Sequence, residues 1–420
     1  MKNEKNKIIC FVLLFLFIFF FFSFKSGWAL KEQSYSCMVC HGDKKVEFIP
    51  SIHYAQRVWC VDCHGGDPSS EEMDVSMSER AGFKGKPSRK ETVFLCGNCH
   101  ADKKRMRQYG IPTDQLEYYQ TSQHGEALLK RNHTKVAICI DCHGTHQIFK
   151  SNDSQSSVFP TKLPGMCAKC HSNQELMSQY SLPSNTLEDY SSGVHGQALL
   201  ERTNRSAPTC AGCHGNHGAA PPGVTEVENV CGQCHIKTAE YFSKSPHEQA
   251  MQKRLMSQCI SCHQHHKTSF PDLGMFDNVC LSCHDKTSEA YDRGQKIKSL
   301  IEEAQTEIGN AKTSIAQAKI KGIEVSSDEN LLEGATSEML QVVPITHTLI
   351  LSEIETHTKA ARSIAKDIDL RIHNIFESMK LRKVALGIIW LFIFLVVIVI
   401  YTKKKRADRE YDLKKAKGEI

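Results

Sequence analysis

The sequence predicts a mainly α-helical protein in which a cysteine-rich region with little regular structure precedes a long helical hairpin and one C-terminal transmembrane helix. Three observations predict this fold class. Eighteen of the nineteen cysteines lie between residues 37 and 283, residues 286–380 carry apolar positions at helical spacing, and residues 384–401 form an uninterrupted apolar run. Segment boundaries are therefore expected near residues 29, 290, 382 and 402.

The first segment, residues 1–29, has the pattern of a secretory signal peptide. Three lysines precede an apolar stretch over residues 8–24, and Ser26-Gly27-Trp28-Ala29 is a small-residue pattern suited to cleavage after Ala29. An uncleaved membrane anchor is the alternative, because the apolar stretch is long for a signal peptide. Both interpretations predict that the region after it is exported.

The second segment, residues 30–290, contains nine copies of the motif Cys-x-x-Cys-His. This spacing is typical of covalent haem c attachment: two thiols on one turn bond to the porphyrin, and the adjacent histidine becomes the proximal iron ligand. The attachment cysteines are Cys37, Cys40, Cys60, Cys63, Cys96, Cys99, Cys139, Cys142, Cys167, Cys170, Cys210, Cys213, Cys231, Cys234, Cys259, Cys262, Cys280 and Cys283. The proximal histidines are His41, His64, His100, His143, His171, His214, His235, His263 and His284. The sequence therefore predicts a multihaem cytochrome c domain with nine covalently bound haem c groups, in which the porphyrins form most of the core.

Zinc and iron–sulfur sites are the alternatives for these cysteines. Structural zinc sites and thiol redox sites also use Cys-x-x-Cys pairs. A zinc site, however, needs four ligands, and it does not require a histidine after every second cysteine. Iron–sulfur clusters likewise take their cysteines in fours. Nine complete motifs therefore favour haem.

The haem region is built from four repeats, and each repeat has an opening and a closing motif. The opening motifs begin at Cys60, Cys139, Cys210 and Cys259, and the closing motifs begin at Cys96, Cys167, Cys231 and Cys280. A leading histidine stands before each opening motif, at His53, His124, His195 and His247. A trailing histidine follows the opening motif in three repeats, at His146, His217 and His266. A lone histidine is ordinarily a surface or core residue, but recurrence in register predicts that these seven are distal iron ligands.

Two haems lack an assigned distal ligand after this count. The first repeat carries Asp67 where the other repeats have the trailing histidine. His347, in the second helical arm, is the first choice as the distal ligand of one of these haems, and His133 and His357 are weaker choices. A vacant iron coordination position is the remaining alternative.

Residues 291–382 are expected to form an antiparallel helical hairpin. Gly322 and the Ser326-Ser327-Asp328 turn interrupt the helical pattern, and the second arm is expected to continue into the membrane with a kink at Pro344. A coiled-coil dimer is the competing interpretation.

The apolar run defines a predicted transmembrane helix over residues 383–402. The tail, residues 403–420, is more cationic than the segment before the run, so it is expected in the cytoplasm, with the haem domain on the periplasmic side of a single-pass anchor. The net charge is only +5, and much of the positive charge lies in this tail, so nothing indicates nucleic-acid binding.

The repeat, with Ser-x-His-Gly-x-Ala-Leu before a motif and Cys-x-x-Cys-His-Gly-x-His within it, resembles the periplasmic multihaem c-type cytochromes. This group includes cytochrome c3-like, cytochrome c554-like and hydroxylamine-oxidoreductase-like proteins and the membrane-anchored quinol dehydrogenase cytochromes. The resemblance implies stacked haems, iron held by two histidines, and electron transfer from iron to iron. Two departures stand out: no Cys-x-x-Cys-Lys motif of the nitrite reductase type occurs, and no tyrosine lies between Tyr291 and Tyr401 to form a hydroxylamine-oxidoreductase-like cross-link.

These features predict an electron-transfer protein tethered to the cytoplasmic membrane. It would move electrons between the quinone pool or a membrane redox partner and periplasmic acceptors. Because one transmembrane helix does not easily build a quinone pocket, a quinone-reactive or cytochrome b-type membrane subunit is the expected partner, together with periplasmic redox proteins. The alternative is a multihaem oxidoreductase, hydroxylamine oxidoreductase-like or nitrite reductase-like, that acts on a small nitrogen or sulfur compound at an open haem iron.

Overall fold

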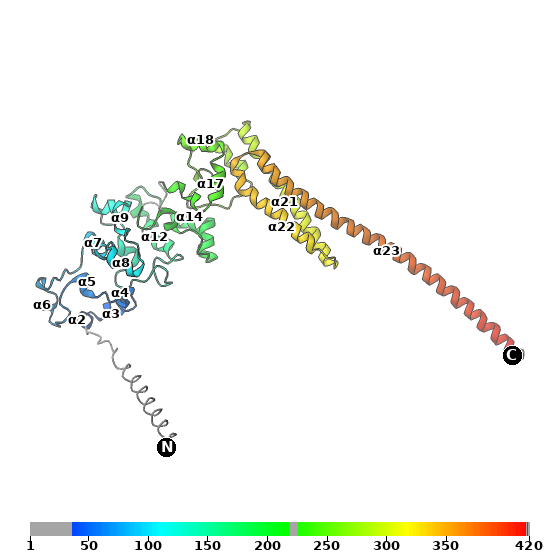
Figure 1. Ribbon diagram of the computed structural model, residues 1–420, viewed down its shortest axis with the longest axis horizontal. Helices are drawn as coiled ribbons and strands as arrows, with labels where there is room; N and C mark the ends of the chain where they lie inside the picture. Colours follow the sequence, from blue (N-terminus) through cyan, green and yellow to red (C-terminus); the bar gives the residue numbers. More distant parts are fainter. Residues whose placement is uncertain (1–35, 219–225, 417, 419–420) are drawn as a thin grey trace, which may run out of the picture. The chain divides into compact units, whose positions relative to one another are not determined.

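The computed structural model describes residues 36–218, 226–416 and 418 (Figure 1). The predicted signal peptide lies outside these residues. The chain divides into two compact units. The first unit comprises Met1–Leu187 and Ala198–Pro221, and the second comprises Glu188–Gln197 and Pro222–Ile420.

The predicted mainly α fold is confirmed, since every regular element in the described ranges is a helix. The elements of the cysteine-rich region are short, as expected. They are α2 (Ser36–Cys40), α3 (Gly42–Phe48), α4 (Ile52–Ala55), α5 (Cys60–His64), α6 (Met73–Ser76), η1 (Glu79–Ala81), α7 (Arg89–His100), α8 (Lys103–Met106), η2 (Arg107–Tyr109), α9 (Gln115–Thr121), α10 (Gln123–Leu129), α11 (Cys139–His143), α12 (Leu163–His171), α13 (Gln174–Ser178), α14 (Thr186–Ser192), α15 (Val194–Gly196), η3 (Gln197–Glu201), α16 (Cys210–His214), η4 (Val227–Gln233), α17 (Ile236–Phe242), α18 (Pro246–Gln252), α19 (Ile260–His263), α20 (Met275–Asn278) and η5 (Cys280–Ser282).

The leading histidines lie in short helices whose starts the sequence specifies. Ser51 and Ser122 are the N-caps of α4 and α10, and their hydroxyls accept hydrogen bonds from the amides of His53 and Gly125. Gly125 is required for a second reason. A Cβ atom there would lie 1.8 Å from the carbonyl oxygen of Tyr119, and at the corresponding Gly196 it would lie 1.9 Å from that of Tyr190. The glycine after the leading histidine therefore lets two helices cross closely.

The C-terminal part consists of three long helices, α21 (Glu289–Ile320), α22 (Ser326–Ile345) and α23 (Leu351–Ala416), with η6 (Thr346–Thr348) between the last two. The expected hairpin is α21 and α22, and Gly322, at φ 73°, lies in the turn between them. The expectation that the second arm continues into the apolar run was wrong. The chain reverses a second time after α22, so the third helix carries the apolar run.

The second reversal has a local cause near Pro344. This residue lies in the last turn of α22, and Leu349 then adopts a left-handed conformation with φ 57°. The Thr348 hydroxyl donates to the carbonyl oxygen of Ile345 at 2.9 Å and accepts from the amide of Ile350 at 3.1 Å. These bonds close a turn where the sequence alone suggested a kink.

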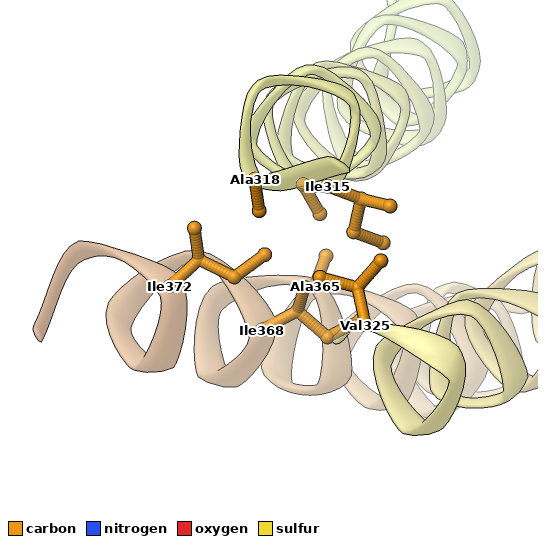
Figure 2. Close-up of a cluster of buried hydrophobic side chains, with 7 residues drawn as sticks. Ile315, Ala318, Val325, Ala365, Ile368 and Ile372 are labelled. Atoms are coloured by element: carbon orange, nitrogen blue, oxygen red, sulfur yellow. The ribbon is translucent and has the colours of Figure 1, made fainter. Parts of the chain in front are cut away.

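The first part of α23 packs along both α21 and α22 (Figure 1). Small and β-branched side chains fill the contact near the α21–α22 turn, including Ile315, Ala318, Val325, Ala365, Ile368 and Ile372, all at most 5% exposed (Figure 2). A second cluster includes Ile297, Val342 and Ile354, and the partly buried Tyr241 and Phe276 pack against it. The helical part and the last haem motifs therefore share an apolar core within the second unit.

The distal part of α23 exposes its apolar run, from Val384 to Tyr401. Within the described ranges, α23 is the one helix long and apolar enough to cross a membrane, with a mean hydropathy of 3.1 over its most apolar window. The predicted single transmembrane helix therefore corresponds to a continuous helical segment.

Candidate functional site

The attachment motifs that open the first two repeats form single helical turns, α5 and α11. The carboxylates of Asp62 and Asp141 accept hydrogen bonds from the amides of Trp59 and Ile138, at 2.6 and 2.8 Å, and so cap these turns. Because one turn holds residues i, i+3 and i+4 on one side, both thiols and the imidazole face the same way. The residue after the proximal histidine has a positive φ in all four opening motifs, at Gly65, Gly144, Gly215 and Gln264. This conformation ends the turn directly after the proximal histidine.

The chemistry of the donor set fits haem c. In the described ranges the eighteen motif cysteines are free thiols, so none is engaged in a disulfide. No group of three or more His, Cys, Asp or Glu side chains there is placed to hold a bare metal ion.

Among the contacts described for the structure, at least seven of the nine proximal histidines face a second histidine. The proximal and distal rings, with their centroid separations, are His100 and His53 at 6.1 Å, His64 and His146 at 6.4 Å, His171 and His124 at 6.1 Å, His143 and His217 at 6.1 Å, His235 and His195 at 6.3 Å, His284 and His247 at 6.1 Å, and His263 and His347 at 6.1 Å. Each pair lies within one of the two units.

These separations are the ones expected for two imidazoles on one metal ion. A metal–imidazole bond is about 2.0 Å long, and the ring centre lies about 1.1 Å behind the nitrogen, so two opposed rings have centroids about 6.2 Å apart. Rings in van der Waals contact would be closer, as His265 and His266 are at 5.0 Å. The seven pairs therefore leave room for one iron each.

Several of these rings are oriented by a hydrogen bond at the nitrogen that does not bind metal. His64 Nδ1 lies 2.9 Å from the carbonyl oxygen of Gly85, and His347 Nδ1 lies 3.2 Å from that of Pro344. His195 Nδ1 lies 3.3 Å from the Thr268 hydroxyl, and His146 Nδ1 lies 3.4 Å from the Glu47 carboxylate. Each bond leaves Nε2 available to a metal, which is the usual arrangement at metal-binding histidines.

Burial keeps most of these imidazoles in the neutral form that binds metals. Desolvation lowers the pKa of ten of the paired histidines, and a neighbouring histidine lowers it further in several pairs. They are His53, His100, His124, His143, His171, His195, His217, His247, His263 and His347.

The pairs follow one rule. Each leading histidine faces the proximal histidine of the closing motif in its own repeat, as His53 faces His100. Each paired trailing histidine instead faces the opening motif of the preceding repeat, as His146 faces His64. His347 faces His263 and so takes the trailing position after the fourth repeat.

Backbone contacts hold this register. The amide of Ile52, beside leading His53, donates to the carbonyl oxygen of Ile148 at 2.8 Å, two residues after trailing His146. The amide of Val194 donates to Thr268 at 2.8 Å in the same way, two residues after His266. Leading and trailing segments of successive repeats are thus tied together.

Three other candidate histidines have further described contacts. His266 lies beside its neighbour His265, with 3.2 Å between their Nδ1 atoms. It remains a predicted ligand. His357 Nδ1 lies 2.7 Å from the Glu338 carboxylate, and the His133 ring contacts Tyr180. These two weaker choices face no proximal histidine in the described contacts.

Cysteines of successive motifs also lie next to one another. The thiols lie close enough to affect one another's pKa in the pairs Cys37 and Cys60, Cys96 and Cys139, Cys167 and Cys210, and Cys231 and Cys259. Electrostatic contacts link further motifs, from Cys63 to Cys99, from Cys142 to Cys170, and from Cys262 to Cys280. Motifs one to six in the first unit, and seven to nine in the second, therefore follow one another in space as in the sequence.

The chain is similar in sequence to a known cytochrome. The high-molecular-weight cytochrome c of Nitratidesulfovibrio vulgaris is 22% identical over 231 residues, which are 53% of this chain and 37% of that protein. The chain thus spans little more than a third of the relative's length. No family model matches the sequence.

Proposed function

We propose that this chain is a membrane-anchored nine-haem c-type cytochrome that transfers electrons between the quinone pool, or a membrane redox partner, and periplasmic acceptors. The observation that carries the proposal is the set of seven opposed histidine pairs, each beside a Cys-x-x-Cys pair. The likeness to a protein named as a cytochrome c supports it.

Each group of residues has a distinct role in this proposal. The eighteen motif cysteines hold nine haems by thioether bonds, and the motif histidines supply the proximal nitrogens. Bound haem c supplies a one-electron iron couple. The opposed histidines would supply a second nitrogen ligand to seven of these haems, which would favour electron transfer over substrate binding and keep the potential low.

The order of the motifs in space supports transfer along the chain. Neighbouring attachment cysteines, such as Cys96 and Cys139, would hold successive haems near one another. Because electron transfer weakens steeply with distance, adjacent edges favour hopping from one haem to the next within each unit.

The membrane end of the proposal rests on α23. Its apolar part would anchor the protein, and the basic tail would lie in the cytoplasm, with the haem region on the other side. A quinone-reactive or cytochrome b-type subunit would pass electrons to or from the haems.

The proposal is tested on the full chain in its own membranes. We expect nine haems per chain by the pyridine haemochrome assay, reduction by a quinol in intact membranes, and loss of that reduction after purification away from partners. A haem content well below nine would refute the nine-haem assignment. Quinol oxidation by the isolated chain at the membrane rate would refute the need for a partner.

A second candidate function, chemistry at an open haem iron, is favoured by one motif. His41, the proposed proximal histidine of the first motif, is exposed, and it belongs to none of the seven opposed histidine pairs.

A further inference from the structure

The haem motifs of the second unit meet the three long helices at one end of those helices. Tyr241, after the seventh motif, and Phe276, before the ninth, pack against the buried cluster that includes Ile354. His347, which faces His263 of the eighth motif, lies in η6, shortly before α23 begins. We call this end of the helices the haem end. The iron position between His263 and His347 therefore lies near the start of α23.

The apolar run of α23 begins far along the helix from the haem end. Ile354 and Val384 belong to one continuous helix (Figure 1). Because an α-helix rises about 1.5 Å per residue, these two residues are about 45 Å apart. A transmembrane helix tilts by at most about 40°, which still leaves about 35 Å along the membrane normal. This separation is at least as large as the thickness of the apolar layer of a membrane, about 30 Å.

The part of α23 between the haem end and the apolar run is built to stay straight. Residues 351–386 contain neither proline nor glycine, at which sharp helix kinks usually occur. Ala365 and Ile368 are at most 1% exposed, because α21 and α22 pack against this part of α23. Arg362 also forms an ion pair with Glu303 of α21 at 2.6 Å. These contacts tie α23 to its neighbours and resist bending.

The surface of these helices indicates that they stand in water outside the membrane. Before the apolar run, α23 carries exposed charged side chains at Glu355, Lys359, Lys366 and Asp367. Charged side chains are costly inside an apolar layer. The anchor would therefore enter the membrane near Val384, and the packed part of α23 would remain outside it.

This spacing restricts where electrons can reach the second unit. The rate of electron tunnelling falls exponentially with distance, so one step across a gap as wide as the apolar layer is far too slow for respiration. A quinol, or a haem within the membrane, would lie on the far side of that gap from the haem end.

We propose that α21, α22 and the first part of α23 form a spacer, and that motifs seven to nine exchange electrons with a one-electron metal centre of the partner complex that projects outside the membrane to the height of the haem end. This inference rests on the proposed function, since it takes the apolar run as the anchor, and it adds where the partner meets this chain. Each transfer moves one electron between the partner's centre and a haem, and no bond forms or breaks.

The first test locates the haems relative to the anchor in the oxidised full chain in liposomes. One variant carries a nitroxide label on Lys383→Cys, at the start of the apolar run, and the matched variant carries it on Ser299→Cys, at the haem end. Both positions are exposed. Relaxation by ferric iron weakens steeply with distance, so we expect fast nitroxide relaxation at position 299 and slow relaxation at position 383. Equally fast relaxation at both positions would place a haem at the membrane and overturn the inference.

The second test asks whether the spacing limits electron transfer. The full chain alone is placed in liposomes with a quinol, which on oxidation to a quinone releases two protons and gives two electrons to two ferric haems. We expect slow reduction by the quinol and fast reduction by a soluble one-electron reductant. The variant Lys380→Gly/Leu381→Pro breaks α23 between the spacer and the apolar run and should speed reduction by the quinol by at least about tenfold. The control Ala407→Gly/Asp408→Pro lies beyond the apolar run and should leave the rate unchanged.

The outcomes separate this inference from the proposed function. Fast quinol oxidation by the unaltered chain would overturn the inference and leave electron transfer standing. The same holds if Lys380→Gly/Leu381→Pro is reduced as slowly as the unaltered chain. A haem count far below nine, or haems that the soluble reductant does not reduce, would instead refute the proposed function.

Discussion

His347 offers the sharpest test of how the helical region serves the haems. Its ring lies 6.1 Å from that of His263, across a gap that two metal–nitrogen bonds of about 2 Å each would fill. Alanine at this position ends at Cβ and offers no donor atom to an iron. The loss of ligation in His347→Ala should therefore be complete at one haem and absent at the other eight.

The assay is quantitative electron paramagnetic resonance on the oxidised full chain, with carbon monoxide titration of the reduced form. We expect His347→Ala to raise the high-spin content and the bound carbon monoxide by one equivalent per nine haems. His357→Ala is the matched control, because His357 lies on the neighbouring helix and bonds to Glu338. An unchanged spectrum in His347→Ala, or the same increase in His357→Ala, would refute the assignment.

Three further predictions concern the scaffold. Gly125→Ala places a Cβ atom 1.8 Å from the Tyr119 carbonyl oxygen and should displace the neighbouring His124. We expect one additional high-spin haem by electron paramagnetic resonance. Gly165→Ala is the control, because a Cβ atom at Gly165 would meet open space, and it should add none. Ile368 is 1% exposed, and Ile368→Ala should lower the free energy of unfolding by about 3 kcal/mol, measured by denaturant unfolding with far-UV circular dichroism. Leu370, which is 59% exposed, is the control. Equal stability in Leu370→Ala and Ile368→Ala would contradict the packing in Figure 2. Asp328 is the buried ion-pair partner of the half-exposed Arg371, whose Nε donates to Asp328 Oδ1 at 2.7 Å. Asp328→Asn removes the charge of this carboxylate and should lower the free energy of unfolding by about 2 kcal/mol in the same assay. An unchanged denaturation midpoint would show that the ion pair contributes nothing to stability.

Much of the candidate site could be predicted without the structure, because haem attachment is local. Two thiols and a proximal nitrogen must sit on one helical turn, so their spacing is written in consecutive residues such as Cys139–His143. The leading histidines could also be found, because Ser51 and Ser122 mark the helix starts that place them. The trailing histidines could be found as well, because they recur three residues after the proximal histidine of the opening motif.

The pairing of ligands with haems could not be predicted in this way. Trailing His217 faces His143 of the preceding repeat rather than a motif of its own, and no local spacing specifies that choice. The sequence carries one indication of this pairing. The first repeat has Asp67 in the trailing position, which agrees with trailing histidines that face the proximal histidine of the preceding repeat.

The sequence by itself determined the chemistry of this protein: where haem c can be attached, which histidines can bind iron, and where an apolar helix can cross a membrane. Short-range spacing and hydropathy are enough for each of these. Only the tertiary structure decided that His347 faces His263, and that the chain reverses after Ile345 before entering α23. Both depend on contacts between residues far apart in the chain, whose free energies come from packing rather than from local propensity.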